Sequence, residues 1–518
     1  MNTVGFLSIP AGLFPDQEIL VFGRRRYTYA QLAELSARIC TVFANLGLER
    51  HEQAAGGADV VAVLDTNSDL YLAAYYAAAR AGLTFLPLNY RAKAPELEYM
   101  LATACARVLL VGERYRPTLA QLRDRLPALH AIIDLGEDSP DNLRQMAEAA
   151  MPAQWEAEIA EEDTSILMYT SGTTSQPKGV MLSFHDFTAY VTANVEMADG
   201  GERGVALICV PFYHIAGATA MMSSPWSGRK MIVMPQFEPR AWLELVARER
   251  VTHAFVVPTM LKQLLDEPAL AHTDLSSLQN LAYGGAPMPL GVIRRAIEVL
   301  PRSVGFVNAY GQTETTSSLT VLGPEDHRLE GNPEEIELKL KRLGSIGRPL
   351  ADVEVMVRDE SGNRLGPDQV GELCIRTPRV MKGYAGHRDE LALGDGWRAT
   401  GDLGWIDRGG YVFFAGRKDD LIIRGGENIA PAEVEAVLMS HPAVEEAAVV
   451  GWPSQEWGQT VAAFIVVRAG HKLDSAELHA FCSARLASFK CPKDYRFIAA
   501  LPRNPLGKIL RKELRAID

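Results

Sequence analysis

Hydroxyl side chains, two glycines and one lysine are concentrated in the run YTSGTTSQPKGV at positions 169–180. Glycine lets backbone N–H groups approach phosphate oxygens, the hydroxyls donate hydrogen bonds to those oxygens, and Lys178 supplies a positive charge. The run does not fit the Walker pattern, GxxxxGK followed by Ser or Thr, because Pro177 precedes the lysine and Gly179 follows it. The sequence therefore predicts a phosphate-binding loop of another kind, and a Ser/Thr-rich surface turn is the plainer alternative.

Three further groups could act on a bound nucleotide. Glu314 lies among small polar residues in YGQTE, which suits a single carboxylate that holds Mg²⁺ together with phosphate oxygens. Asp402 in TGDLG is expected on a glycine-flanked turn, where its carboxylate could accept two hydroxyl hydrogen bonds from a ribose. Lys508 in PLGKIL could place a compact positive charge where negative charge develops. Taken singly, each has a plainer interpretation: a solvated Glu, a turn-stabilising Asp and a solvated Lys.

These groups belong to a series of motifs in a fixed order. After SGTT-x-x-PKG come AYGQTE (309–314), WRATGD (397–402), GRKDDLIIRGGENIAPAEVE (416–435) and LPRNPLGKILR (501–511). The series resembles the adenylate-forming (AMP-binding) superfamily of acyl-CoA synthetases, luciferases and amino-acid adenylation domains. The resemblance implies an ATP-dependent acyl-CoA synthetase that uses Mg²⁺ and coenzyme A. Such an enzyme converts a carboxylic acid to acyl-AMP and pyrophosphate, and coenzyme A then displaces AMP.

The same resemblance implies roles for individual residues. Lys508, Glu314 and Thr170 would be catalytic, and Glu314 would be the metal ligand. The expected ATP- and AMP-binding residues are Thr170, Ser171, Gly172, Thr173, Thr174, Lys178, Gly285, Ala286, Pro287, Ala309, Tyr310, Gly311, Gln312, Thr313, Asp402, Arg417 and Lys508.

The acyl pocket would lie at Phe212, His214, Tyr283 and Gly285. We expect His214 to form part of the pocket wall, because a carboxylate is already ionised at neutral pH and needs no general base. The resemblance implies an Asp near this point in enzymes that adenylate amino acids, and residues 211–217 contain none, which disfavours an amino-acid substrate. From family prevalence, a medium- or long-chain fatty acid is the expected acid, ahead of aryl and short-chain acids.

Two positions concern the movement of the C-terminal region. Asp419 is implied as a hinge about which a small domain turns between the two half-reactions. Arg424, Gly425 and Gly426 would then approach the large domain and bind coenzyme A, with the glycines leaving room for its pantetheine arm. The simpler interpretation of RGG is a hairpin turn, and the two interpretations are compatible.

The sequence departs from the family pattern at Ser175, where glycine is usual, and at Asn504, where Thr is common. A positive φ at Ser175 would strain a non-glycine residue. Three other functions stay open: loading of a carrier protein, nucleotide binding without catalysis, and a luciferase-like oxidation.

The elements that must position these residues read as α/β layers. Thr28 and Gln31 form a capping box before an amphipathic helix that continues to Gly47. Strand 59–65, helix 69–82 and strand 84–88 predict a βαβ unit, and further strands are expected at 205–210, 230–235, 253–258 and 280–285. A helix is expected from about Ser183.

After about residue 345, short alternating strands predict an antiparallel β-rich subdomain. A compact α+β unit follows, with expected helices at 431–442 and near 475–487. We therefore predict an N-terminal domain at 1–418, layered α/β with the β-rich subdomain, and a small mobile C-terminal domain at 419–518.

Composition limits the class of protein. A chain of 518 residues with 47% hydrophobic residues can bury a large core, and its net charge of −12 argues against a nucleic-acid partner. Six scattered cysteines without a CxxC pair fit a reducing compartment, so a cytoplasmic location is expected. The RRR at 24–26 reads as a solvated turn rather than a phosphate or lipid patch. Peripheral membrane contact and the oligomeric state stay open.

Overall fold

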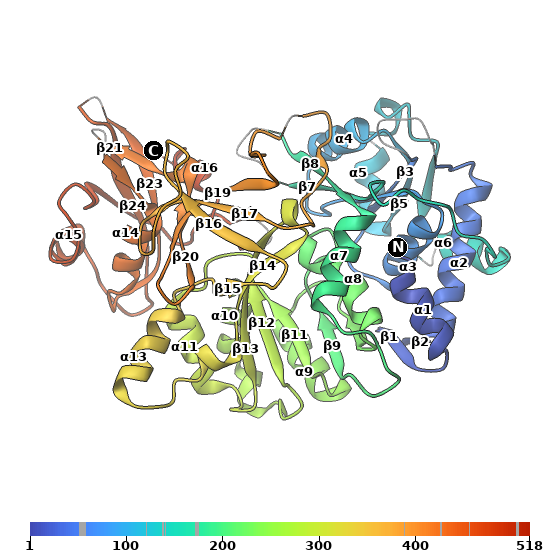
Figure 1. Ribbon diagram of the computed structural model, residues 1–518, viewed down its shortest axis with the longest axis horizontal. Helices are drawn as coiled ribbons and strands as arrows, with labels where there is room; N and C mark the ends of the chain where they lie inside the picture. The colour runs from blue at the N-terminus through green and yellow to red at the C-terminus, as the bar shows by residue number, and fades with distance from the viewer. Residues whose placement is uncertain are drawn as a thin grey trace.

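In its described residues the chain is arranged around four β-sheets, as a computed structural model shows (Figure 1). The structure describes residues 1–50, 58–120, 122–136, 139, 141–170, 176–387, 389–424, 427–454, 456–503 and 507–517. Two large mixed sheets flanked by helices form the first two thirds, followed by an antiparallel sheet and a small α+β unit. The predicted fold class, with its β-rich subdomain and its smaller C-terminal unit, is confirmed.

The first large sheet has seven strands, and its centre is parallel. The predicted βαβ unit is present, since β3 and β4 are parallel neighbours joined by α3 (Asp69–Arg80). The other helices of this part are α1 (Gly5–Leu13), α2 (Tyr29–Asn45), α4 (Ala94–Thr103), α5 (Arg116–Ala120), α6 (Leu143–Ala149) and α7 (Phe184–Asn194). In spatial order the strands are β18 (Gly383–Tyr384), β8 (Lys178–Ser183), β7 (Thr164–Thr170), β4 (Thr84–Pro87), β3 (Val60–Leu64), β5 (Ala106–Val111) and β6 (Ala131–Asp134).

The second large sheet has nine strands, and the four strands expected from residue 205 to 285 lie side by side in it as parallel neighbours. Their connecting helices are α8 (Ile215–Trp226), α9 (Pro239–Glu249) and α10 (Pro258–Asp266), followed by α11 (Leu290–Val299), α12 (Pro324–His327) and α13 (Pro333–Arg342). In spatial order the strands are β15 (Arg348–Pro349), β14 (Ser317–Leu322), β13 (Gly305–Gln312), β12 (Asn280–Gly284), β11 (His253–Val256), β9 (Val205–Ile208), β10 (Lys230–Val233), β1 (Glu18–Phe22) and β2 (Arg25–Thr28).

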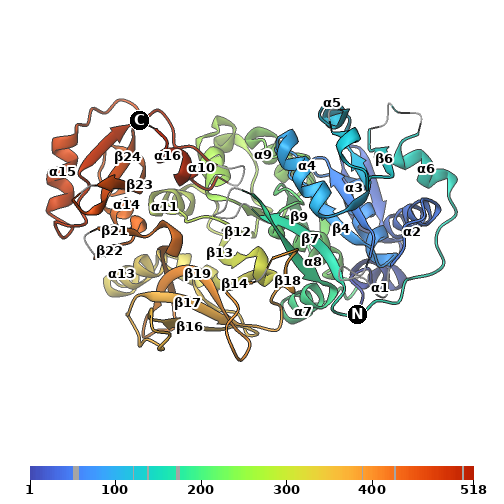
Figure 2. The ribbon, with the colours of Figure 1, turned by 90° about the horizontal axis from the view of Figure 1, so that it is seen from above.

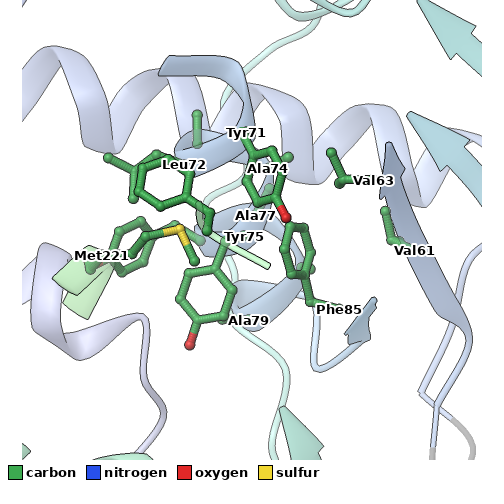
Figure 3. Close-up of a cluster of buried hydrophobic side chains, with 14 of the residues drawn as sticks. Val61, Val63, Tyr71, Leu72, Ala74, Tyr75, Ala77, Ala79, Phe85 and Met221 are labelled. Atoms are coloured by element: carbon green, nitrogen blue, oxygen red, sulfur yellow. The ribbon is translucent and has the colours of Figure 1, made fainter. Parts of the chain in front are cut away.

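Helix α3 forms the centre of the largest hydrophobic core. All of its residues except Arg80 are buried, which explains why its sequence is rich in alanine on every side. Figure 3 shows Tyr71 and Tyr75 of this helix beside Phe85 of β4 and Met221 of α8.

The predicted capping box at the start of α2 is confirmed. The Thr28 side chain accepts from the backbone N–H of Gln31, and the Gln31 side chain accepts from the backbone N–H of Thr28.

The β-rich subdomain is a four-stranded antiparallel sheet, in which β19 lies between β17 and β20. Its strands are β16 (Glu354–Arg358), β17 (Gly371–Arg376), β19 (Trp397–Ile406) and β20 (Val412–Arg417). A single 3-10 turn, η5 (Lys418–Asp420), joins this sheet to β21 of the next one. The predicted 418/419 boundary falls in this turn and stays a prediction.

The C-terminal unit packs three helices on a five-stranded sheet and lies at one end of the molecule (Figure 2). The helices are α14 (Pro431–Met439), α15 (Ser475–Ser483) and α16 (Arg511–Leu514), and the strands are β22 (Glu427–Ile429), β21 (Ile422–Arg424), β24 (Gly458–Val467), β23 (Val444–Ser454) and β25 (Asp494–Phe497). It contacts helix α10 of the second sheet, where Lys262 lies 3.1 Å from Glu445 of β23. Among the described residues, no helix combines the length and hydropathy needed to cross a bilayer.

The RRR run at 24–26 is not simply a solvated turn. Arg25 donates to the buried carboxylate of Asp69 at 2.6 Å, and Arg144 and Tyr27 donate to the same carboxylate at 2.7 and 2.5 Å. Burial alone would raise the pKa of Asp69, but these donors outweigh it and hold that pKa below its ordinary value. The interpretation as a solvated turn is therefore wrong for Arg25, because this side chain binds a buried carboxylate. No local pattern in the sequence indicates that contact, since Asp69 lies 44 residues away.

Replacing Asp69 by Asn should lower the free energy of unfolding at pH 7 by about 3 kcal/mol, because Arg25 and Arg144 lose their buried counter-ion. The folded-state pKa of Asp69 lies below its ordinary value of 3.8, so its stabilisation is present above pH 3.8 and is lost as the pH falls further. The difference between Asp69→Asn and wild type in urea unfolding should thus shrink in acid. Glu244→Gln, which removes an exposed partner of Arg240, should stay within about 0.5 kcal/mol of wild type. Equal losses for both variants would contradict this account.

Candidate active site

Asp402 lies in the middle of strand β19, not on the turn that the sequence predicts. Its neighbour Gly401 has φ +71°, and the pairing with β20 shifts between Leu403 and Gly404. A side chain at Gly404 would meet the carbonyl oxygen of Phe413 at 2.2 Å. The glycines of TGDLG therefore permit an irregular, closely packed strand, and this irregularity was mistaken for a turn.

The Asp402 carboxylate is the centre of a buried polar cluster. Its Oδ2 accepts from the hydroxyl of Tyr310 at 2.5 Å and from Nε2 of Gln312 at 2.9 Å. Gln312 also donates to the carbonyl of Thr400 at 2.9 Å, which fixes the orientation of its amide. The side chains that YGQTE and TGD contribute thus meet, although 90 residues separate Gln312 and Asp402.

The second oxygen of Asp402 has a different environment. Nε of Arg417 lies 2.8 Å from Oδ1, within ion-pair distance, but its N–H is not directed at that oxygen. Among the described residues, Oδ1 is buried and has no hydrogen-bond donor. Burial raises the pKa of Asp402, and Arg417, Tyr310 and Gln312 act in the opposite direction. An unpaired buried acceptor is costly, and a ligand hydroxyl could satisfy it.

Lys508 approaches this cluster from the C-terminal unit. Its neighbour Gly507 has φ +75°, and a side chain there would meet Oγ1 of Thr259, at the start of α10, at 2.5 Å. Only glycine therefore permits this close approach. Lys508 is exposed to solvent, yet enough protein surrounds it that desolvation, and then the charge of Arg417, lower the pKa of its ammonium group. Asp402 acts in the opposite direction, so Lys508 and Asp402 are electrostatically coupled.

Glu314, the expected metal ligand, lies in the 3-10 turn η4 (Thr313–Thr315) that ends β13. Its Oε1 accepts from the hydroxyl of Tyr384 at 2.9 Å. The Tyr384 ring in turn lies below Nζ of Lys178, 5.2 Å from its centroid. Tyr384 thus connects the carboxylate expected to hold Mg²⁺ with the lysine expected to bind phosphate.

Sequence reasoning missed Tyr384. The residue reaches the site because β18 pairs antiparallel with β8, which sets Tyr384 opposite Val180. Burial raises the pKa of Tyr384, and the nearby Glu314 carboxylate raises it further, so the hydroxyl is a donor at neutral pH. A two-residue strand carries no periodicity, so no local signal in the sequence could have identified it.

The predicted metal fits Glu314 as an ion that arrives with ATP. Within the described part of the chain, no group of three or more His, Cys, Asp or Glu side chains could hold a metal ion. Mg²⁺ is commonly held by one or two carboxylates together with substrate phosphates. A single carboxylate next to the predicted phosphate loop is therefore compatible with an ion that arrives with ATP.

The predicted phosphate loop connects two antiparallel strands. Thr170 ends β7 and is paired with Lys178, the first residue of β8. Ser183 then caps α7, which begins at Phe184, so the helix predicted from about Ser183 is confirmed. The strand β8 was missed. Several predicted residues lie outside the described part of the chain, so their assignments stay predictions: Ser171, Gly172, Thr173, Thr174, Ser175, Gly425, Gly426 and Asn504.

The predicted acyl-pocket residues flank α8 and the end of β12. His214 precedes α8, and a side chain at Gly217 would meet the carbonyl oxygen of Pro211 at 2.2 Å, so the helix start packs tightly on that segment. Nε2 of His214 is buried, and burial lowers the pKa of the imidazole to about 3, with a contribution from Arg91. His214 is therefore neutral at pH 7 and a very weak base.

Phe212 and Tyr283 have fully buried side chains. Phe212 packs against Tyr71 at 5.3 Å between ring centroids, and the Tyr283 hydroxyl lies 2.9 Å from Nε2 of His327. Gly285, by contrast, is exposed, with φ +78°. Of these residues, Gly285 at the carboxyl end of β12 is thus accessible, whereas the two aromatic rings are not.

The remaining predicted nucleotide-binding residues lie on two neighbouring segments. Gly284 ends β12 and residues 285–287 follow it, and β12 and β13 are so close that a side chain at Gly284 would meet the Ala309 carbonyl oxygen at 2.1 Å. The residues of these segments that are at least partly exposed are Gly285, Ala286, Pro287, Ala309, Tyr310, Gly311 and Thr313. The predicted hinge Asp419 is in η5, and Arg424 ends β21 opposite Glu427.

Replacing Tyr384 by Phe should raise the dissociation constant of Mg·ATP about tenfold, because Glu314 loses the donor that orients it while the ring below Lys178 is kept. Isothermal titration measures this constant directly. Tyr411→Phe is the matched control, since Tyr411 also donates to a carboxylate, that of Asp326 at 2.9 Å, outside this cluster. Unchanged affinity in Tyr384→Phe, or an equal loss in the control, would contradict the role given to Tyr384.

Comparison with known proteins shows the family to which this chain belongs. The family model described as AMP-binding enzyme matches residues 10–385, and the model of its C-terminal domain matches residues 433–508. The chain is 35% identical to the fatty acid–acyl-carrier-protein ligase ScoC of Streptomyces coeruleorubidus over 498 residues, which is 95% of this chain and 91% of that protein.

A second relative and a solved structure agree with this match. The chain is 35% identical to a feruloyl-CoA synthase of an Amycolatopsis species over 513 residues, 98% of this chain and 96% of that protein. It also superposes on the ATP-bound MatB of Rhodopseudomonas palustris with a TM-score of 0.87 and 29% identity, covering 100% of this chain and 99% of MatB. The chain therefore belongs to the AMP-binding enzyme family, and it is an acid–thiol ligase of the adenylate-forming kind.

Proposed function

We propose that this protein is an ATP-dependent acyl-CoA synthetase that converts a medium- or long-chain fatty acid to acyl-AMP and then to acyl-CoA. The observation that carries the proposal is the Asp402 cluster. Tyr310 and Gln312 bind one oxygen of this buried carboxylate, and the charge of Lys508 acts on the same carboxylate. Within the described part of the chain, the other oxygen has no donor and lies next to Arg417. Ribose hydroxyls of ATP would donate to that oxygen, which leaves the α-phosphate toward Lys508.

In the first half-reaction a carboxylate oxygen of the acid attacks the α-phosphorus, and the bond to the bridging oxygen of pyrophosphate breaks. Lys508 stabilises the negative charge that develops on the α-phosphate, and its compact ammonium group suits a single point of charge. Thr170, Lys178 and the residues between them hold the β- and γ-phosphates. Glu314 would hold the Mg²⁺ that accompanies ATP, and the bound ion would neutralise phosphate charge.

In the second half-reaction the thiol of coenzyme A attacks the acyl carbonyl carbon, the bond to AMP breaks, and the thiol proton leaves to solvent. We assign residues 1–418 to the domain that binds ATP and the acid, and residues 419–518 to a domain that turns about Asp419. This rotation would move Lys508 away from the nucleotide and bring Arg424, Gly425 and Gly426 to the pantetheine arm. The single short turn η5 between the two sheets supports this hinge.

The acid pocket is proposed beside α8 and the end of β12. The neutral state of His214 supports a role in the pocket wall, because a group with a pKa of about 3 is a poor base at pH 7. Gly285 is exposed at the end of β12, where an acid could bind, whereas the fully buried rings of Phe212 and Tyr283 could contribute only from beneath the pocket wall. ScoC, named for fatty acids, supports an aliphatic chain, whereas the feruloyl-CoA synthase supports an aryl acid as the second candidate.

A carrier protein in place of coenzyme A is the alternative acceptor, because ScoC is named as a ligase of acyl-carrier protein. The two acceptors share the phosphopantetheine thiol, so the same reacting groups would serve both. The two acceptors differ in what is attached to the phosphopantetheine arm, so turnover measured with each acceptor distinguishes them.

The test is AMP release from ATP and Mg²⁺ with short-chain, medium-chain, long-chain and aryl carboxylates. Each acid is assayed alone, with coenzyme A and with phosphopantetheinylated acyl-carrier protein. We expect turnover with medium- or long-chain acids only when coenzyme A is present.

Two other outcomes would contradict the proposal in different ways. Turnover that requires the carrier protein would replace the acceptor, and turnover with aryl acids alone would replace the substrate class. Absence of acid-dependent exchange between pyrophosphate and ATP for every acid would overturn the adenylation step itself.

A further inference from the structure

Arg379 is a fully buried arginine whose guanidinium is surrounded by acceptors. Its Nε lies 2.6 Å from Oδ2 of Asp352, and Nη2 lies 3.3 Å from Oδ1 of the same carboxylate. Nη1 donates to the carbonyl of Thr315 at 2.8 Å, and Nη2 donates to that of Ser318 at 2.7 Å. A fork of five N–H groups can satisfy all of these acceptors at once, which a lysine cannot do.

The carbonyls that Arg379 binds belong to a strained turn. Thr316 and Ser317 have φ +49° and +84°, values that L-residues rarely adopt, and a β-branched residue such as Thr adopts least readily. Such conformations persist only where the surrounding structure imposes them. Arg379 donates to carbonyls on both sides of the two strained residues, so it supplies that constraint.

The strained turn lies next to Glu314 and Gly311 of the candidate active site. It begins two residues after Glu314, and the Ser317 carbonyl oxygen would lie 1.8 Å from a side chain at Gly311. Met381, two residues after Arg379, donates its backbone N–H to the Glu314 carbonyl at 2.8 Å. The segment that carries Arg379 and Met381 therefore fixes the backbone of Glu314 from behind, while Tyr384 binds its carboxylate.

We propose that Arg379, held by Asp352, is a positioning residue for Mg·ATP: it maintains the left-handed turn at Thr316–Ser317 and thereby the orientation of the Glu314 carboxylate. This inference rests on the proposed role of Glu314 in holding Mg²⁺. Arg379 does not touch the nucleotide cluster itself; it acts through the turn. Neither Arg379 nor Asp352 belongs to the motifs that identify the nucleotide site.

The test compares ATP affinities with and without Mg²⁺ by isothermal titration. In Arg379→Lys, the dissociation constant of ATP with Mg²⁺ should rise roughly tenfold, as for loss of other groups that orient a metal ligand. With EDTA in place of Mg²⁺, the dissociation constant should change less than about twofold, because Asp402, Tyr310 and Gln312 are not altered. Asp352→Asn keeps the arginine and the side-chain size, and it should change affinity in the same direction by a smaller factor.

Arg144→Lys is the matched control, since Arg144 also binds a buried aspartate, Asp69 at 2.7 Å, outside the active site. Thermal unfolding of every variant identifies a purely structural effect. Loss of thermal stability in Arg379→Lys and Asp352→Asn with unchanged Mg²⁺-dependent affinity would overturn the inference, as would an equal loss of affinity with and without Mg²⁺. Failure of wild type to bind ATP would instead contradict the proposed function.

Discussion

The buried carboxylate of Asp402 is the interaction on which the arrangement of the site depends. It is 1% exposed, and its contacts join β13, β19 and β20, which belong to two different sheets. A buried carboxylate without positive charges or donors would be very unfavourable, so Arg417, Tyr310 and Gln312 must be close to it. The need to satisfy one anion thus fixes the second large sheet against the β-rich subdomain.

The same carboxylate lies next to the junction between the β-rich subdomain and the C-terminal unit. Arg417 is the last residue of β20, and the chain enters the C-terminal unit directly after it. A cation that pairs with the central carboxylate therefore stands next to the proposed hinge. The contact of Gly507 with Thr259 and the ion pair of Lys262 with Glu445 keep Lys508 on the side of α10. Movement of this unit would separate Lys508 from Asp402 without breaking the Arg417–Asp402 pair.

Sequence reasoning succeeded where a residue and its neighbours along the chain decide the outcome. The Thr28 capping box, the βαβ unit around α3 and the parallel strands from 205 to 285 follow from local patterns, and the structure confirms them. It failed where the contacts of a side chain depend on a residue far away in the sequence. Arg25 binds Asp69, Tyr384 reaches Glu314 through a two-residue strand, and Arg379 contacts a turn more than sixty residues earlier.

For the nucleotide site, the motifs predicted which residues matter but not how they meet. Asp402 was placed on a turn because glycines flank it, although Gly404 permits the close pairing of β19 with β20 and Gly401 adopts a positive φ within the strand. Nothing in one motif reveals that Tyr310 and Gln312 share one oxygen of Asp402 and leave the other without a donor. Such arrangements depend on packing between sheets, which a single sequence does not encode in any local pattern.

The most direct test of the central claim is a single-turnover measurement of the two half-reactions in wild type and Lys508→Ala. The account predicts that formation of acyl-AMP from ATP and the acid falls at least ~100-fold in the variant, as for loss of a group that stabilises transition-state charge. Thioester formation from supplied acyl-AMP and coenzyme A should stay within about twofold of wild type. Equal losses in both half-reactions, or no loss in the first, would contradict a catalytic role of Lys508 beside Asp402.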